Sequence, residues 1–411
     1  MTVGEKLTSE HSKAYYGEDW WVSPFNAPGN DEMKVRLPKK VQLHDVTLRD
    51  GEQTPGIVFN KEDKVAIATA LSEIGVHRIE VGMPIISKEE KDAIKTITSE
   101  GLSAKIFTLA RLIKNDIDLS AETGVNGVVL ETPLGTPKRR QLGWSVEKAM
   151  ELTLEMIDHA KSYGLFVSTF GVDTTRTEED IYMDYVRQVN STKVDSITLV
   201  DTFGCTTYEG MAYLTGKVSK LTSKPLEVHT HNDFGLSVAS SFAAVTKGAS
   251  TVHVAVNGIG ERTGNAPLDE IVMGLKYLYG IDTGVKLSKL FEVSRLVEER
   301  SNFKTPSNKP FVGTRAFGRE SGISVAGWAK YNLGSEPVLP DVVGNKHEVV
   351  IGKKSGKGSI EYKLKELKLW NDKVNEEQLE KLMMMVKEKS QATKREIPDE
   401  EFRKMAKTVI S

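Results

Sequence analysis

The sequence has little cysteine and lacks long apolar stretches, and both shortages exclude classes of protein. A single cysteine, Cys205, among 411 residues cannot form a disulfide within the chain, which is typical of a reducing compartment. No apolar run approaches the roughly 18 residues that a transmembrane helix needs. The N-terminus leads into a polar stretch rather than into the apolar core of a secretory signal. We therefore expect a cytoplasmic protein without a membrane partner.

Net charge is also nearly absent, since 55 Lys and Arg face 57 Asp and Glu. No basic run interleaved with aromatic residues occurs, so nucleic acid is not an expected partner. A glycine-rich dinucleotide fingerprint after the first apolar run is missing, which weighs against a nicotinamide enzyme. Hydrophobic residues make up 39% and charged residues 27%, which excludes a disordered, collagenous or coiled-coil chain. At about 150 residues per domain, the length predicts two or three domains, or one large barrel with an appendage.

From residue 41 the sequence alternates short apolar runs with segments of helical periodicity. In Lys61–Ile74 and Val146–Tyr163, for example, apolar residues recur every three or four positions. Alternating strands and helices predict an α/β fold with a parallel sheet, and eight units match a (β/α)₈ TIM barrel, with an open doubly wound sheet as the competing topology. The predicted strands are Val41–Thr47, Arg78–Gly82, Lys105–Leu109, Gly127–Glu131, Phe166–Phe170, Ser196–Asp201, Leu226–Thr230 and Thr251–Val256.

Four segments are predicted from this pattern. Residues 1–40 read as an irregular N-terminal extension, and residues 41–282 as the catalytic barrel. Residues 283–345 form a linker and loop-rich subdomain that contains a helix over Leu287–Arg300. Residues 346–411 are rich in Lys and Glu and predict a small helical C-terminal subdomain. We expect this part to pack on the barrel or on a second subunit of a homodimer or higher homo-oligomer.

The carboxyl ends of the predicted strands carry polar residues, and barrel enzymes have their active sites there. The first strand runs into Thr47-Leu-Arg49-Asp50-Gly-Glu52-Gln53, whose polar side chains are costly to bury without partners. The seventh strand contains His229 and His231, which are two residues apart and therefore point to the same face. Two adjacent imidazoles predict a divalent metal site, although a hydrogen-bonded pair of core histidines has the same pattern.

Further ligands are available near these histidines. Asp50 can add an anionic oxygen, because a closed barrel brings its first strand within reach of the seventh. Asn265, in a glycine-rich loop after the eighth strand, can add an amide oxygen. The set Asp50, His229, His231 and Asn265 leaves positions for water or a chelating substrate. Its mixed nitrogen and oxygen atoms suit Mg²⁺, Mn²⁺ or Zn²⁺ without deciding among them.

Three neighbouring residues are candidates for catalysis and substrate binding. Arg49 would place a permanent cation beside an oxygen polarised by the metal, a good device for stabilising an enolate or alkoxide. Glu80, at the end of the second predicted strand, is a candidate acid or base, or else an ion-pair partner of Arg49 or Arg78. Thr202 follows the sixth strand and can hydrogen-bond a carboxylate.

Five ordered motifs carry these residues. They are Asp45-x-Thr47-Leu-Arg49-Asp50-Gly-Glu52-Gln53, Ile79-Glu80-x-Gly82-x-Pro84, Asp201-Thr202-x-Gly204, His229-x-His231-Asn232-Asp233-x-Gly235 and Gly258-Ile-Gly-Glu261-Arg262-x-Gly264-Asn265-Ala266. Over roughly residues 40–360, the set resembles the metal-dependent pyruvate carboxyltransferase-like barrels, which include 2-isopropylmalate, homocitrate and citramalate synthases and, more distantly, hydroxymethylglutaryl-CoA lyase. Glu261-Arg262 stands where the lyases carry a cysteine-containing loop, and the layout resembles that of homocitrate synthase most closely.

The resemblance implies an acyltransferase that performs a Claisen-type condensation of acetyl-CoA, or a related acyl-CoA, with a 2-oxo acid. The acid would chelate the divalent metal while Arg49 and Thr202, with Gln53 from the same motif as Arg49, hold it. The enolate of the acyl-CoA would attack the ketone, and hydrolysis of the thioester would follow. The alternatives are a metal-dependent carbon–carbon lyase that uses the same enolate in reverse and a catalytically silent metal-binding scaffold.

The sequence departs from this resemblance around the substrate. Ser324 stands where the synthases usually have an acid/base histidine, and Ser335 replaces a tyrosine before Glu336. After the fourth strand, Glu131–Pro137 replaces a Ser-Asp-x-His segment, so we expect Glu131 to contact the substrate. Arg176 is retained and could grip a second carboxylate if it faces the lumen. An altered substrate pocket is therefore expected.

Overall fold

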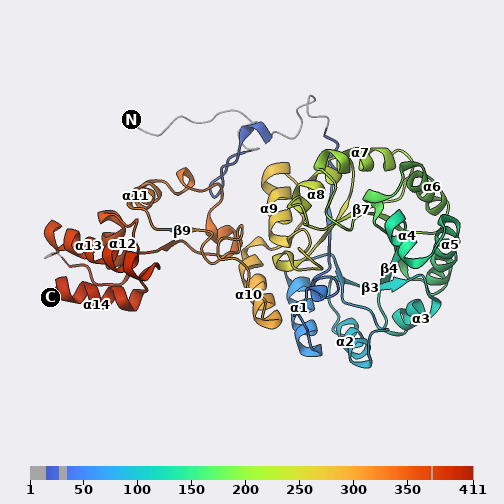
Figure 1. Ribbon diagram of the computed structural model, residues 1–411, viewed down its shortest axis with the longest axis horizontal. Helices are drawn as coiled ribbons and strands as arrows, with labels where there is room; N and C mark the ends of the chain where they lie inside the picture. The colour runs from blue at the N-terminus through green and yellow to red at the C-terminus, as the bar shows by residue number, and fades with distance from the viewer. Residues whose placement is uncertain (1–14, 27–34, 372–373, 411) are drawn as a thin grey trace. The chain divides into compact units, whose positions relative to one another are not determined.

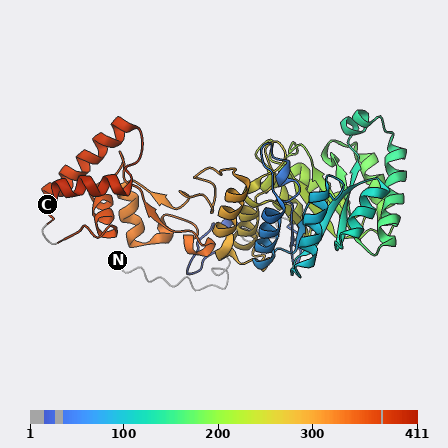
Figure 2. The same cartoon turned by 90° about the horizontal axis from the view of Figure 1, so that it is seen from below.

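The computed structural model describes residues 15–26, 35–371 and 374–410 (Figure 1 and Figure 2). The chain divides into two compact units. The barrel unit comprises residues 26–305, and the terminal unit comprises residues 1–25 together with residues 306–411.

Eight parallel strands of the barrel unit form a closed barrel in chain order, which confirms the predicted TIM barrel. The barrel closes where β1 pairs with β8, with His44 opposite His253 in the register. The strands are β1 (Gln42–Asp45), β2 (Arg78–Glu80), β3 (Lys105–Arg111), β4 (Gly127–Pro133), β5 (Phe166–Val172), β6 (Ser196–Asp201), β7 (Leu226–Thr230) and β8 (Thr251–Val254).

Helices surround the ring of strands (Figure 1). In α1, a capping box between Asn60 and Asp63 starts the helix, and Ile67 and Leu71 are buried one turn apart. The α-helices of this unit are α1 (Lys61–Glu73), α2 (Lys88–Ser99), α3 (Lys114–Glu122), α4 (Thr136–Leu142), α5 (Val146–Ser162), α6 (Glu179–Asn190), α7 (Tyr208–Val218), α8 (Ser237–Val245), α9 (Leu268–Tyr279) and α10 (Leu290–Ser301). Its 3₁₀ turns include η4 (Gly51–Gln53), η5 (Thr174–Arg176), η6 (Val256–Gly258) and η7 (Leu287–Lys289). No helix among the described residues is both long and apolar enough to cross a bilayer.

The terminal unit is mainly helical, as predicted for the C-terminal part. Val349, Ile360, Leu382 and Phe402 lie in its apolar core. Its elements are the parallel strands β9 (Gly318–Arg319) and β10 (Glu348–Val349), the helices α11 (Gly322–Lys330), α12 (Lys357–Glu366), α13 (Glu376–Thr393) and α14 (Asp399–Val409), and the 3₁₀ turns η2 (Pro24–Asn26, whose last residue falls in the barrel unit), η8 (Asn332–Gly334) and η9 (Pro340–Val343).

The two units divide the chain differently from the four predicted segments. The predicted boundary at residue 282 lies inside the barrel unit, because α10 packs against α1 and buries Val293 and Val297. The predicted N-terminal extension is split, since the Trp21 backbone N–H donates to the Pro337 carbonyl in the terminal unit. The parts of that extension in residues 1–14 and 27–34 lie outside the described residues.

Candidate metal and substrate site

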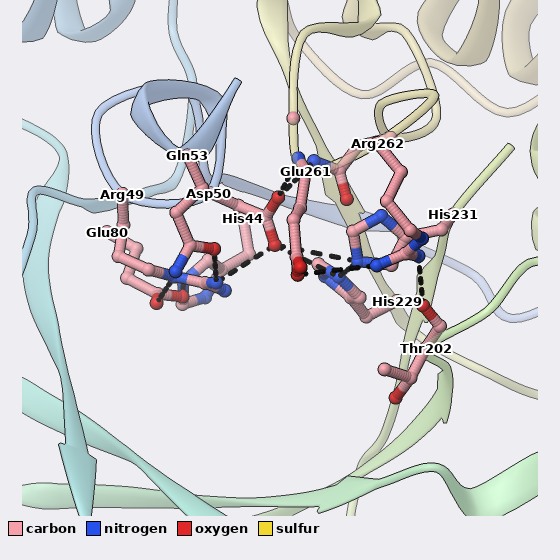
Figure 3. Close-up of polar contacts among 12 residues, drawn as sticks. His44, Arg49, Asp50, Gln53, Glu80, Thr202, His229, His231, Glu261 and Arg262 are labelled. Carbon is pink, nitrogen blue, oxygen red and sulfur yellow. Dashed lines mark hydrogen bonds and ion pairs between the residues drawn. The ribbon is translucent and has the colours of Figure 1, made fainter. Parts of the chain in front are cut away.

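Three of the predicted metal ligands converge at the carboxyl ends of β1 and β7 (Figure 3). The Asp50 Oδ2 atom lies 3.6 Å from the Nε2 atoms of both His229 and His231. Those two nitrogens are 3.2 Å apart. All three side chains are buried, and their ligand atoms lie within 4.8 Å of one another. Such a cluster of one carboxylate and two imidazoles could hold a divalent cation.

The fourth predicted ligand, Asn265, points its amide into the same cluster. Its Nδ2 donates to Asp50 Oδ1 at 2.9 Å and to the Ile259 carbonyl at 3.1 Å. The Asn265 Oδ1 atom is consequently turned away from both acceptors, and it is buried without a hydrogen-bond partner. A buried polar atom left unpaired costs about 1–3 kcal/mol, and a cation would satisfy it. The donor set therefore fits a divalent metal ion.

Gly260 permits the close approach of the loop after β8 to Asp50 and Asn265. Gly260 has a φ of 156°, and a Cβ there would lie 2.1 Å from Asn265 Nδ2 and 2.9 Å from Asp50 Oδ1. The adjacent Glu261 backbone N–H donates to Asp50 Oδ1 at 3.1 Å. The loop after β8 thus orients the Asp50 carboxylate directly, which only a residue without a side chain at position 260 allows.

Electrostatics keep these groups in the protonation states that bind metal. Burial alone would raise the pKa of Asp50, but the neighbouring Arg49 charge and the hydrogen bond from Asn265 lower it. Burial, followed by the adjacent His231, holds the pKa of His229 well below its ordinary value. Burial also lowers the pKa of His231. An ionised carboxylate thus stands beside two neutral imidazoles, the forms that coordinate a cation.

Arg49 bridges this cluster and Glu80. Its Nη1 donates to Asp50 Oδ2 at 2.9 Å and lies 3.5 Å from Gln53 Oε1, so Gln53 adjoins the site. Its Nε donates to Glu80 Oε1. The remaining nitrogen, Nη2, is buried and has no hydrogen-bond partner. One donor of the guanidinium is therefore available to a ligand.

Glu80 has the second of the two roles that the sequence allows, that of an ion-pair partner. Its Oε1 accepts from Arg49, and its Oε2 accepts from His44 Nε2 at 3.2 Å. Burial alone would raise the pKa of Glu80, but Arg49 and the hydrogen bond to His44 lower it to about 2. Glu80 is therefore a weak proton acceptor near neutral pH. Arg78, the other candidate partner, pairs with Glu227 instead.

Thr202 and Arg176 differ in what they can offer a substrate. Thr202 Oγ1 accepts a hydrogen bond from the Asp173 backbone N–H at 2.7 Å, which leaves the hydroxyl hydrogen free to donate. Arg176 is engaged with Asp173 through Nε and Nη2 at 2.7 and 2.8 Å. Its guanidinium also lies 3.9 Å from the centre of the Phe203 ring. The structure thus does not bring Arg176 to the cluster as a free cation, because a local aspartate already neutralises it.

Glu131, at the carboxyl end of β4, lies within electrostatic reach of Arg49. Burial raises the pKa of Glu131, and the positive charge of Arg49 opposes this without cancelling it. No described residue hydrogen-bonds its carboxylate. Glu131 therefore combines proximity to Arg49 with a carboxyl group that protonates more readily than an exposed one.

A second buried cluster was not among the predicted site residues. His44, Glu227 and His253 bring their ligand atoms within 4.8 Å of one another inside the barrel. The available signal was the presence of ionisable residues inside runs otherwise rich in Val and Ile, which is unusual for buried strands.

Comparisons with known proteins agree with this architecture. The HMGL-like family matches residues 40–297, and a "Homocitrate synthase post-HMGL domain-like" family matches residues 311–394. A homocitrate synthase of Methanothermobacter thermautotrophicus is 37% identical over 393 residues, which cover 95% of this chain and 98% of that protein. A 2-isopropylmalate synthase of Methanocaldococcus jannaschii is 40% identical over 357 residues, covering 86% of this chain and 68% of that protein.

Solved structures agree on the fold alone. The crystal structure of a Bacillus subtilis HMG-CoA lyase matches with a TM-score of 0.59 at 21% identity, covering 66% of this chain and 96% of that one. The two family matches together extend over both units, and the relatives at about 40% identity are synthases. The chain therefore belongs to the HMGL-like family and is an acyltransferase-type enzyme within it.

Proposed function

We propose that this enzyme condenses acetyl-CoA, or a related acyl-CoA, with a 2-oxo acid. The observation that carries the proposal is the unpartnered Nη2 of Arg49, which is fixed beside Asp50 of the Asp50, His229 and His231 cluster. A cation and a free guanidinium donor placed together suit an oxygen that gains negative charge. The names of the two synthase relatives support the same reaction class.

Four residues would hold the metal. The Asp50 carboxylate, the imidazoles of His229 and His231, and the unpartnered Asn265 Oδ1 form a mixed oxygen and nitrogen set. Mg²⁺, Mn²⁺ and Zn²⁺ all accept such a set, and the donor types do not favour one of them. A divalent ion there supplies a Lewis acid that polarises the carbonyl of a bound 2-oxo acid.

Two side chains would orient the 2-oxo acid. Arg49 Nη2 donates to the ketone oxygen as that oxygen becomes an alkoxide, and it is already desolvated and held in place by Asp50 and Glu80. A donor preorganised in this way typically contributes about 3–4 kcal/mol to the transition state. The free hydroxyl hydrogen of Thr202 donates to the substrate carboxylate.

Proton transfer is assigned to Glu131. It removes a proton from the carbon next to the thioester carbonyl, and the electron pair of that C–H bond forms the new bond to the ketone carbon. The carbonyl electron pair moves to the ketone oxygen, which then takes up the proton that Glu131 removed. Water afterwards cleaves the thioester, releasing CoA as the thiol and leaving a carboxylate. Glu80 is unsuited to this task because its pKa is held near 2.

The test is release of free thiol from acetyl-CoA in the presence of one 2-oxo acid at a time, from pyruvate to 2-oxoglutarate, with Mg²⁺, Mn²⁺ or Zn²⁺. Release that depends on both the acid and the metal supports the condensation. Cleavage of a 3-hydroxyacyl-CoA without any such release would establish the lyase reaction instead. If neither reaction occurs with any acid and metal, the chain is a metal-binding scaffold and the proposal is wrong.

A further inference from the structure

Inside the barrel, ionisable side chains form two hydrogen-bonded chains that meet at a pair of stacked imidazoles. The first, which we call the Arg49 arm, runs from His44 Nε2 to Glu80 Oε2 at 3.2 Å, and from Glu80 Oε1 to Arg49 Nε. His44 and Glu80 are completely buried, and Arg49 is nearly so. This arm ends at the candidate metal site.

The second chain, the Arg78 arm, mirrors the first. His253 Nε2 lies 2.9 Å from Glu227 Oε2, and Arg78 Nη1 donates to Glu227 Oε1 at 2.6 Å. Arg78 lines a cavity of about 660 Å³ together with Gln42 and Lys105, which lie at the amino ends of β1 and β3. The Arg78 arm therefore leads away from the metal site, toward the opposite end of the barrel.

The arms do not make a convincing second metal site, although His44, Glu227 and His253 offer ligand atoms within 4.8 Å. The rings of His44 and His253 lie only 13° from parallel with centroids 4.4 Å apart, so their lone pairs do not converge. The charge of Glu227 is matched by Arg78. A buried cation would have no surplus carboxylate to balance it there.

Some pairs of the same unit, such as Arg78 with Glu227 and Arg300 with Asp63, are made through Nη1 alone. The Arg49 arm belongs with the pairs in which an arginine Nε donates to a carboxylate. In the other pairs of that kind, the second carboxylate oxygen accepts from Nη2 of the same arginine, the side-on fork that makes such pairs strong. Three pairs have this geometry: Arg111 with Asp116, Arg176 with Asp173, and Arg262 with Asp233. Glu80 takes only Nε of Arg49, its other oxygen is held by His44, and Nη2 has no partner.

We infer that His44 prevents Glu80 from closing this fork on Arg49 and thereby keeps Nη2 available to the substrate. With Oε2 engaged by His44, the Glu80 carboxylate presents a single oxygen to the guanidinium. Without that hydrogen bond, Oε2 would turn to Nη2 and form the fork seen in the three other pairs. His44 is accordingly a positioning residue that acts through Glu80 on Arg49. The inference rests on the proposed function for the identity of the substrate.

The surroundings of His44 fix the position and the protonation state of its ring. Its ring stacks on His253 and lies in a T-shaped arrangement with Phe107, whose ring centroid is 5.2 Å away. Burial, followed by the nearby His253, lowers the pKa of His44 to about 4. The imidazole is therefore neutral, with one proton, and that proton is used on the Glu80 carboxylate. A rigid ring with a single donor fixes Glu80 more strictly than a flexible side chain would.

The test compares His44→Phe with His44→Gln. Phenylalanine keeps the shape and the stacking but cannot donate, whereas the glutamine amide can donate to Glu80 Oε2. Glu227→Gln is the matched control, since it alters the equivalent carboxylate of the Arg78 arm. His44→Asn, which has a donor too short to reach Glu80, is the second variant if phenylalanine disturbs folding. Metal content and thermal unfolding are measured for every variant.

Two readouts do not require turnover. In a crystal structure of His44→Phe, we expect Arg49 Nη2 within about 3 Å of Glu80 Oε2. Titration calorimetry with oxalate, a stable dianionic chelator, should show affinity for metal-loaded His44→Phe reduced about tenfold, most of it restored in His44→Gln and unchanged in Glu227→Gln. In turnover, KM for the 2-oxo acid should rise and kcat should fall, while KM for acetyl-CoA stays the same.

The inference is overturned if His44→Phe, folded and metal-loaded, leaves Nη2 unpaired and binds oxalate as wild type does. It is also overturned if Glu227→Gln weakens oxalate binding as much as His44→Phe. Failure of the proposed function has a different signature. The wild type would then bind oxalate without releasing thiol with any 2-oxo acid, while the structural difference between His44→Phe and wild type would remain.

Discussion

Among its described residues, the barrel holds two buried clusters of the same composition, each with one carboxylate and two histidines. The two clusters differ in charge balance. Around Asp50, His229 and His231, the carboxylates of Asp50 and Glu80 share one guanidinium, that of Arg49. In the other cluster, one carboxylate, that of Glu227, pairs with one guanidinium, that of Arg78. The first cluster therefore has negative charge in excess, and Asn265 Oδ1 is unsatisfied beside it. Residue types alone do not define a metal site; surplus charge and converging lone pairs do.

Removing Asp50 tests that comparison most severely. We expect Asp50→Ala to bind no stoichiometric metal and to lose essentially all turnover, because it removes the only anionic ligand and the partner of Arg49 Nη1. Metal analysis after gel filtration should find about one equivalent in wild type and in Glu227→Gln. Loss of metal from Glu227→Gln, or two equivalents in wild type, would show that the second cluster is also a metal site.

Glu131→Gln should be the next most damaging change, with kcat reduced roughly 10²- to 10⁴-fold and metal content unchanged. The pKa of Glu131 is raised by burial, so the base is increasingly protonated, and inactive, as pH falls through that raised value. The rate of wild type should therefore decline on the acid side at a pH above the ordinary glutamate value. That decline should disappear in Glu131→Gln. If Glu131→Gln shows the same decline in rate at acid pH as wild type, the decline belongs to another ionisable group.

Arg49→Lys separates metal binding from oxyanion stabilisation. A lysine can reach Asp50 or Glu80 but cannot contact both and still offer a third donor, as the guanidinium does. We expect metal content to stay near wild type while kcat/KM falls about 10²-fold, equivalent to roughly 3 kcal/mol of transition-state stabilisation. An unchanged kcat/KM would remove Arg49 Nη2 from the mechanism.

The sequence predicts the features that depend on the order of the strands along the chain and on which side chains of a strand point to the same face. Strands β6 and β7 have the predicted bounds, and the meeting of Asp50 with His229 follows from closing a barrel whose first and seventh strands both end in polar residues. The pairing of Arg176 with Asp173 was not foreseen, because both follow β5 in a turn whose geometry sets which partner the arginine meets. The assignment of α10 to the barrel unit could not be predicted, because the helical periodicity of Leu287–Arg300 does not show against which unit the helix packs.

The contact of His44 with Glu80 was hidden for another reason. It depends on the register between β1 and β2, where His44 lies opposite Arg78 rather than opposite Glu80. A list of polar residues at strand ends gives no register, and a one-residue shift would direct each side chain to the other face of the sheet. Only coordinates show that one buried carboxylate serves both a histidine and the guanidinium of Arg49.

The smallest expected effect concerns the second cluster, and it is a change in the free energy of unfolding rather than in the reaction rate. Glu227→Gln leaves Arg78 without its charged partner. We expect the free energy of unfolding to fall by about 2 kcal/mol at neutral pH. This loss is smaller than is usual for breaking a buried ion pair, because Arg78 borders a cavity. Although burial would raise the pKa of Glu227, His253 and Arg78 lower it. Its stabilisation is therefore present above the unfolded-state pKa, about 4.3, and is lost as pH falls toward the folded-state value. The difference in free energy of unfolding between wild type and variant, measured with urea, should accordingly become smaller below about pH 4. A difference that stays constant with pH would contradict an ionic contribution from this pair.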